Sequence, residues 1–315
     1  MLTNDDLIQL DCPPELTAAG IDYTTQKLAH AAGDAGAEDF DHLRAAAAGA
    51  AAELAFRRLL NLRQVPLHHV EPAGFEPARQ AGIAIGGRRC ILSSQLITHK
   101  KEIQRLHGDP GIMLGYPAGE PSARPLPGYQ REDLLIFALM TGLVSRGRQG
   151  LEKAVQAGER YYLFARLPAE WYAPRAWTGL GELALKSDCS QPVKLTVTGL
   201  DKRRALLSRQ SMLPRRTRLT LPGDFYSLGF LHIDPLPDGA VGVHSPALGK
   251  THLVSAYQWG NLWVYDLRIF LCGWLSVEEY QRQVKPGAAA LRSSLRLGDL
   301  RPLEKLFGRA RDWGG

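Results

Sequence analysis

Residues 80–94 read Gln80-Ala81-Gly82-Ile83-Ala84-Ile85-Gly86-Gly87-Arg88-Arg89-Cys90-Ile91-Leu92-Ser93-Ser94 and decide the fold of the first half of this chain. Two apolar runs, Gly82–Ile85 and Cys90–Leu96, flank the Gly86-Gly87 pair. Glycine adopts positive φ at little steric cost, and a Gly-Gly pair between apolar runs is typical of a tight hairpin. We therefore expect two antiparallel strands here.

The segment before the hairpin is rich in alanine. From Ala37 to about Leu62, the residues Leu43, Ala47, Leu54 and Leu59 recur at near-helical spacing, so we expect one helix. The other elements of this half follow from short apolar runs and from Gly and Pro positions. They are a strand at Val65–Val70, a loop at Glu71–Arg79, a helix from about Thr98 to His107, a proline-rich loop at 115–131, a strand at Asp133–Thr141, a short helix at Gln149–Ala157 and a strand at Tyr161–Leu167.

This order of elements, together with the helix phrase Gly49-Ala50-Ala51-Ala52-Glu53 and the strand Tyr161–Ala165, resembles the PD-(D/E)XK or restriction-endonuclease-like nuclease fold over about residues 37–168. The resemblance implies a glutamate on the helix, an aspartate on one hairpin strand and an acid-x-Lys pattern on the other. In that family the carboxylates hold one or two Mg²⁺ ions that activate a water, and the lysine helps to orient it.

The chain departs from that pattern at the residues that bind metal. Glu53 aligns with the helix glutamate, but the hairpin aspartate falls near Gln80 or Ala81, and the acid-x-Lys positions fall on Ile91 and Ser93. None of these four side chains is a carboxylate or a cation. We therefore expect a nuclease-like fold without nuclease activity, with no metal site and no cofactor.

A relocated active site is the alternative. No Asp or Glu occurs between Glu76 and Glu102, so substitute acids would have to come from Glu102 or Asp109, acting with Glu53 as the catalytic residue. Mg²⁺ or Mn²⁺ is expected only in that case, and the activity would be that of a metal-dependent endonuclease.

The pattern changes after Pro174. Short apolar runs separated by turn residues recur at regular spacing, which is typical of an all-β sandwich or barrel. They are Gly181–Lys186, Val193–Thr198, Arg218–Leu221, Gly229–Ile233, Ala240–Val243 and Leu253–Tyr257. The run Trp263–Trp274 then leads to Ser276, which with Glu279 predicts a capping box at the start of a helix. Another short helix is expected at Leu303–Arg311.

The chain is therefore expected to be an α+β protein with four parts. These are an N-terminal extension (1–36), a nuclease-like α/β domain (37–174), a β-rich sandwich- or barrel-like domain (175–290) and a basic C-terminal tail (291–315). The late aromatic residues form either the core of the β-rich domain or a stacking platform for single-stranded nucleic acid. They are Trp259, Trp263, Tyr265, Phe270 and Trp274.

Basic residues are concentrated in one segment. Residues 1–60 hold ten acids against four bases, whereas residues 201–218 hold one acid and seven bases. Such a segment suggests a polyanionic partner, and the bland alternative is a solvated basic face. The predicted nucleic-acid-binding residues are Lys100, Lys101, Arg105, Lys202, Arg203, Arg204, Arg209, Arg215, Arg216 and Arg218.

Composition limits the class of protein. Of 315 residues 45% are hydrophobic and 22% charged, which is typical of a globular protein, and the four cysteines form no CxxC pair. No apolar run reaches the about 20 residues of a membrane span, so we expect a cytoplasmic location and no membrane partner.

The predicted function is a non-catalytic nucleic-acid-binding subunit, or pseudo-nuclease, of a bacterial complex that acts on foreign or mobile DNA, as in antiviral defence. DNA is favoured over RNA, and other protein subunits are expected as partners. The alternatives are the active nuclease described above and a protein–protein adaptor with no nucleic-acid role.

Overall fold

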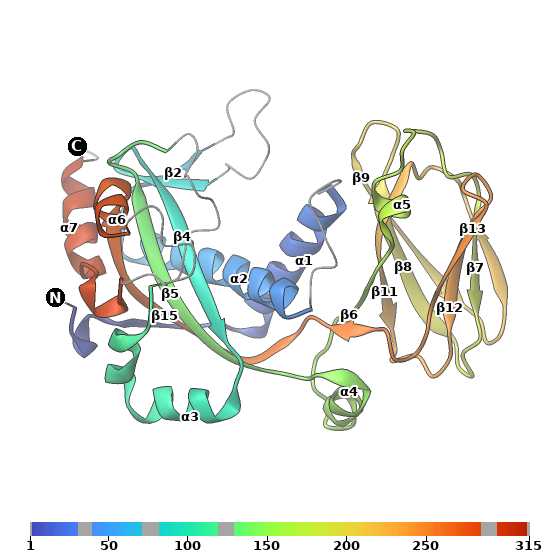
Figure 1. The fold of residues 1–315 in the computed structure, drawn as a ribbon, viewed down its shortest axis with the longest axis horizontal. Helices are drawn as coiled ribbons and strands as arrows, with labels where there is room; N and C mark the ends of the chain where they lie inside the picture. The colour runs from blue at the N-terminus through green and yellow to red at the C-terminus, as the bar shows by residue number, and fades with distance from the viewer. Residues whose placement is uncertain (1, 31–39, 71–81, 119–128, 285–294, 314–315) are drawn as a thin grey trace. The chain divides into compact units, whose positions relative to one another are not determined.

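A computed structural model of the chain describes residues 2–30, 40–70, 82–118, 129–284 and 295–313 (Figure 1). The chain divides into two compact units, each built from segments that are distant in the sequence. Unit 1 comprises Met1–Gly20, Ala48–Leu143 and Tyr265–Gly315, and unit 2 comprises Ile21–Ala47 and Val144–Val264. The coarse class expected from the sequence, α+β, is confirmed.

A six-stranded sheet forms the centre of unit 1, in the order β1-β15-β5-β4-β3-β2 (Figure 1). The strands are β1 (Ile8–Asp11), β2 (Leu67–Val70), β3 (Gly82–Ile85), β4 (Arg88–Ile97), β5 (Leu134–Val144) and β15 (Val264–Ser276). Strands β2, β3 and β4 are successively antiparallel, and β4 is parallel to β5. The predicted hairpin is confirmed, with Gly86 and Gly87 both at positive φ.

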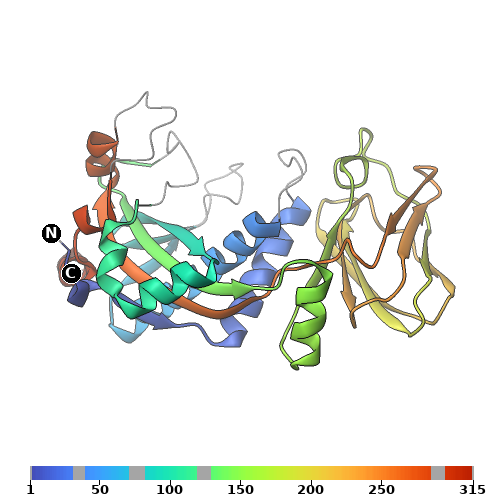
Figure 2. The same ribbon diagram turned by 60° about the horizontal axis from the view of Figure 1, so that its bottom comes forward.

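Helices cover both faces of this sheet. The unit 1 part of α2 (Phe40–Leu62) approaches β4 closely, since a Cβ added at Gly49 would lie 2.8 Å from the Ser94 hydroxyl. Helix α3 (Lys100–Gly108) buries Ile103 and Leu106 in a core with the apolar side chains of β5 and β15. In Figure 2 the blue α2 passes behind the strands and the teal α3 lies in front of them.

The C-terminal elements complete unit 1. Short helices are η1 (Asn4–Asp6), η3 (Pro110–Gly115), η4 (Leu297–Asp299) and α6 (Val277–Gln283), followed by α7 (Leu303–Trp313). The capping box predicted at α6 is confirmed: the Ser276 hydroxyl accepts from the Glu279 N–H at 3.2 Å, and the Glu279 carboxylate accepts from the Ser276 N–H at 3.1 Å. At the other end, Trp313 of α7 packs against the hairpin turn, so closely that a Cβ added at Gly86 would lie 2.6 Å from its ring.

Unit 2 consists mainly of two antiparallel sheets that share one hydrophobic core (Figure 1). Their orders are β10-β7-β12-β13 and β14-β6-β11-β8-β9. The strands are β6 (Leu163–Arg166), β7 (Leu183–Ser187), β8 (Val193–Leu200), β9 (Leu206–Leu213), β10 (Arg218–Leu221), β11 (Ser227–Asp234), β12 (Val241–Ser245), β13 (Lys250–Val254) and β14 (Gly260–Asn261). The helices are α4 (Gly147–Gln156), α5 (Ala169–Tyr172) and the greater part of α1 (Pro14–His30).

The division of the chain differs from the expected domains 37–174 and 175–290. Strand β15 lies beyond residue 175 but joins β1 and β5 in the sheet of unit 1, whereas β6 lies before that residue and pairs with β11 in unit 2. The expected extension 1–36 contains β1 and α1, and the expected tail 291–315 contains α7. Strand β9 was not expected at all, and β13 begins three residues before the predicted Leu253.

Candidate functional site

Strand β9 is an edge strand of the five-stranded sheet in unit 2 and carries basic residues at both ends. It pairs with β8 along eight residues, Val193↔Leu213 to Leu200↔Leu206. Eight residues at about 3.4 Å each make an edge about 27 Å long. The seven bases predicted from the sequence lie on this strand, in the turns at its two ends and at the start of β10, and all seven are exposed. We call this set the β9 basic edge: Lys202, Arg203, Arg204, Arg209, Arg215, Arg216 and Arg218.

The turn that enters β9 is held in one conformation by its own hydrogen bonds. The Asp201 carboxylate accepts from the N–H groups of Arg203 and Ala205, each at 2.8 Å. The indole N–H of Trp177 donates to the Lys202 carbonyl at 3.0 Å, and the Arg204 guanidinium lies 4.7 Å from the centre of the Trp177 ring. The backbone that presents Lys202, Arg203 and Arg204 is therefore ordered by specific contacts.

The turn that leaves β9 has a comparable arrangement. Arg216 has a φ of 49°, and the Thr217 hydroxyl donates to the Arg215 carbonyl at 2.9 Å. In the middle of the strand, Arg209 forms an ion pair with Asp224 at 3.1 Å. Because the other bases of this turn form no ion pair within the described chain, their charge is available to a partner.

The three remaining predicted nucleic-acid-binding residues lie in unit 1, on α3. Lys100 and Lys101 are exposed at its first turn, and Arg105 is exposed one turn later. The predicted set therefore divides into three residues on a helix of unit 1 and seven on the β9 basic edge of unit 2.

The positions expected to bind metal in a nuclease are occupied differently in unit 1. Glu53 on α2 forms an ion pair with Arg57, one turn later on the same helix. On the hairpin, Ile91 and Ser93 are the residues of β4 at the acid-x-Lys positions, and Gln80 and Ala81 lie outside the described residues.

A second carboxylate of unit 1 is also paired with arginine. Asp133, almost fully buried before β5, accepts from the backbone N–H of Arg89 at 2.9 Å and of Gln130 at 2.8 Å, and the Arg89 guanidinium lies 3.5 Å from it. Arg89 also stacks on Tyr129, at 4.8 Å from the ring centre. Burial, with smaller contributions from Asp133 and Glu53, raises the pKa of Tyr129. Arginine guanidinium groups thus neutralise both Glu53 and Asp133.

The substitute acids considered for an active nuclease have structural partners. Glu102 accepts a hydrogen bond from the Tyr116 hydroxyl at 2.6 Å, which together with burial raises the pKa of Tyr116 to about 12. Asp109 caps η3 by accepting from the Gly111 N–H at 3.0 Å. Within the residues that the structure describes, no group of three or more His, Cys, Asp or Glu side chains is placed to hold a metal ion.

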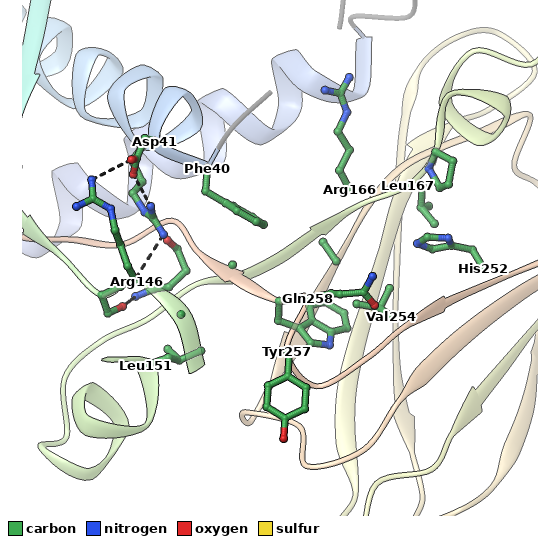
Figure 3. Close-up of a pocket in the computed structure, with 18 of the residues that line it drawn as sticks. Phe40, Asp41, Arg146, Leu151, Arg166, Leu167, His252, Val254, Tyr257 and Gln258 are labelled. Carbon is green, nitrogen blue, oxygen red and sulfur yellow. Dashed lines mark hydrogen bonds and ion pairs between the residues drawn. The ribbon is translucent and has the colours of Figure 1, made fainter. Parts of the chain in front are cut away.

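A pocket of about 840 Å³ in unit 2 was not predicted from the sequence (Figure 3). It lies where the start of α2, the segment after β5, the end of β6 and the turn between β13 and β14 meet. Its lining residues are scattered over some 220 positions of sequence, from Phe40 to Asn261, so no local motif marks them. Among the late aromatic residues, Trp259 lines this pocket, while Phe270 and Trp274 are buried in unit 1.

Comparisons with known proteins give no match: no family model, no curated protein and no solved structure is similar enough to this chain to be reported. In the described part of the chain, no helix has the length and apolar character needed to cross a membrane. The functional argument therefore rests on the chain's own geometry and charge.

Proposed function

We propose that this chain is a non-catalytic nucleic-acid-binding protein in which the β9 basic edge contacts the phosphate backbone. The observation that carries the proposal is the arrangement of that edge. Seven exposed bases line one edge strand about 27 Å long, and two internally hydrogen-bonded turns fix the backbone that presents them. An edge of this length spans about eight phosphates of one duplex strand, at about 3.4 Å each.

The edge position favours contact with a linear polyanion over simple solvation. Charged residues on an edge strand also prevent association between sheets, and one or two lysines suffice for that purpose. Here six of the seven bases are arginines, whose planar guanidinium groups bind phosphate oxygens in a bidentate manner. Trp177, already stacked on Arg204, adds a flat surface beside the entering turn.

The second part of the proposal is that unit 1 is a nuclease-like scaffold that has lost its metal site. Its order of a helix (α2), three antiparallel strands (β2, β3, β4), a helix (α3) and a strand parallel to the third (β5) supports the resemblance to the restriction-endonuclease-like fold. Arg57 and Arg89 supply positive charge to Glu53 and Asp133, which leaves these carboxylates poorly suited to bind Mg²⁺.

In this proposal the protein is a cytoplasmic subunit of a bacterial complex that acts on foreign or mobile DNA, with a β-rich sandwich-like module beside the nuclease-like one. The scaffold positions DNA for a catalytic partner subunit. The ordered turns of the β9 basic edge support binding by backbone contacts, which are independent of base sequence.

The proposal is tested by fluorescence anisotropy and gel analysis of the full chain with labelled single-stranded DNA, duplex DNA and RNA. Each is measured at about 50 mM and about 200 mM salt, with and without Mg²⁺ or Mn²⁺. We expect salt-sensitive binding of DNA without cleavage. Metal-dependent cleavage that is abolished in Glu53→Ala would establish the active nuclease instead. Absence of binding at low salt would leave the protein–protein adaptor.

A further inference from the structure

One wall of the unit 2 pocket is a rigid polar network. Asp41 accepts hydrogen bonds from Arg44 at 2.7 Å and from Arg146 at 2.9 Å (Figure 3). Arg44, only 5% exposed, also donates to the Asn261 carbonyl at 2.7 Å, and the Asn261 amide donates to the Ser145 hydroxyl at 2.8 Å. The two arginines lower the pKa of the Asp41 carboxyl against the opposing effect of burial. This wall is therefore held in place before any ligand arrives.

The pocket also contains donors that the protein itself does not satisfy. Within the described residues, three buried side-chain nitrogen atoms have no hydrogen-bond partner, and two of them belong to residues that line this pocket. They are Nη1 of Arg166 and Nε1 of Trp259. A buried donor left without a partner costs about 1–3 kcal/mol, which a ligand with acceptor atoms recovers. Both atoms are donors, so the missing group is an acceptor.

The charge and the aromatic content of the lining narrow the ligand further. Three arginines face one aspartate, and burial lowers the pKa of His252, so that this histidine is neutral near pH 7. Tyr257 is 80% exposed, an unusual position for so large a ring, and Arg166 stacks on Tyr172 at 4.6 Å from the ring centre. The pocket thus offers net positive charge and open aromatic surface together.

The shape indicates an elongated ligand. In Figure 3 the side chains of Arg166 and Tyr257 extend in opposite directions, with Phe40 between them. Strand β14 pairs with β6 only as far as Phe164. Because the Leu167 N–H donates to Gly229 of β11, alternation along an antiparallel strand turns the Arg166 backbone toward the opposite side, beyond the end of β14. A ligand that passes this edge meets backbone hydrogen-bonding groups between the cationic and the aromatic regions.

We propose that this pocket binds a nucleotide, with the phosphate at Arg166 and the base against Tyr257. A nucleotide joins an anion to a flat ring with several acceptor atoms, which is the combination that the lining offers. Its source is either a free nucleotide or an unpaired residue of a nucleic-acid strand. The second source rests on the proposed function, in which the β9 basic edge holds the rest of the strand.

Isothermal titration calorimetry of the full chain tests this assignment, with adenosine 5′-monophosphate, adenosine, inorganic phosphate, a short oligothymidine and a short polyglutamate peptide as probes. We expect the monophosphate to bind more tightly than adenosine or phosphate. Arg166→Gln should weaken its binding about 10- to 100-fold, since hydrogen bonds to charged groups contribute about 1.5–3 kcal/mol. Tyr257→Ala should weaken it at least about fivefold, through lost stacking. Competition by oligothymidine identifies a strand as the source, and its absence identifies a free nucleotide; both support the assignment.

Controls separate the pocket from the β9 basic edge. Arg282→Gln, on the surface of α6, matches the loss of one arginine and should leave nucleotide binding unchanged. Arg166→Lys keeps the charge and should restore part of the affinity if Arg166→Gln perturbs folding. Duplex binding should be unaffected by the pocket variants. Equal affinity for polyglutamate, absence of monophosphate binding, or unchanged binding in both pocket variants would overturn the assignment, whether or not duplex DNA binds elsewhere.

Discussion

Removing charge from the turns of the β9 basic edge gives the sharpest prediction of the account. The variant replaces Lys202, Arg203, Arg215, Arg216 and Arg218 with glutamine. These five exposed bases form no ion pair within the described chain, whereas Arg209 is paired with Asp224 and Arg204 is stacked on Trp177. The five substitutions should therefore remove charge without breaking a structural contact, and the thermal unfolding midpoint should stay close to that of the parent protein.

The magnitude follows from counterion release. Each phosphate contact on duplex DNA contributes about 0.9 to the slope of log K against log salt concentration, so five contacts contribute about 4.5. Over a fourfold change in salt, from about 50 to about 200 mM, that slope corresponds to a loss of affinity of about 500-fold in the parent protein. The variant should lose most of this salt dependence and bind weakly at both concentrations.

The assay is fluorescence anisotropy with one labelled duplex over a series of salt concentrations. A matched control replaces five exposed bases of unit 1 that lie outside α3 and the hairpin, and it should retain the parent slope. Control substitutions are Arg63, Arg282, Lys305, Arg309 and Arg311 to glutamine. If the β9 variant keeps the parent slope, or if the control loses as much of it, net charge rather than the β9 basic edge accounts for binding.

Three further predictions concern stability and the lost metal site. Gly86→Ala should cost about 1–2 kcal/mol for positive φ and more for its contact with Trp313, whereas Gly87→Ala, with open space around it, should cost only the backbone part; urea unfolding of both separates the two terms. Burial lowers the pKa of His232, so the unfolded state takes up its proton first as pH falls below about 6.5, and the unfolding midpoint should drop less in His232→Gln than in the parent. Asp133→Asn should lower stability without creating metal binding, which calorimetry with Mg²⁺ checks.

Local chemistry made several elements predictable. The Gly86-Gly87 turn, the alanine-rich α2 and the capping box of α6 are each specified within a few residues, and each was found where the sequence indicated. Strand β9 was missed because an edge strand exposed on both faces shows no alternation of apolar and polar residues. Helix α1 was missed because buried threonines such as Thr17 and Thr25 weaken its apolar stripe.

Tertiary relations were less accessible from the sequence. Strand β15 lies after the β-rich segment but returns to the sheet of unit 1, and a run of apolar residues does not reveal which sheet it joins. The seven bases of the β9 basic edge were predicted because they are dense in the sequence. The pocket was not, because Phe40, Arg166 and Tyr257 come from three distant segments.

Hydrogen exchange of the full chain, with and without duplex DNA, tests the central claim most directly. Outward-facing amides of an edge strand exchange rapidly when nothing covers them. The account predicts that DNA slows exchange at residues 201–218, in the turns at both ends of β9, and leaves the interior strands of that sheet unchanged. Bound DNA that produces no protection in this segment would contradict the assignment of the β9 basic edge as the nucleic-acid interface.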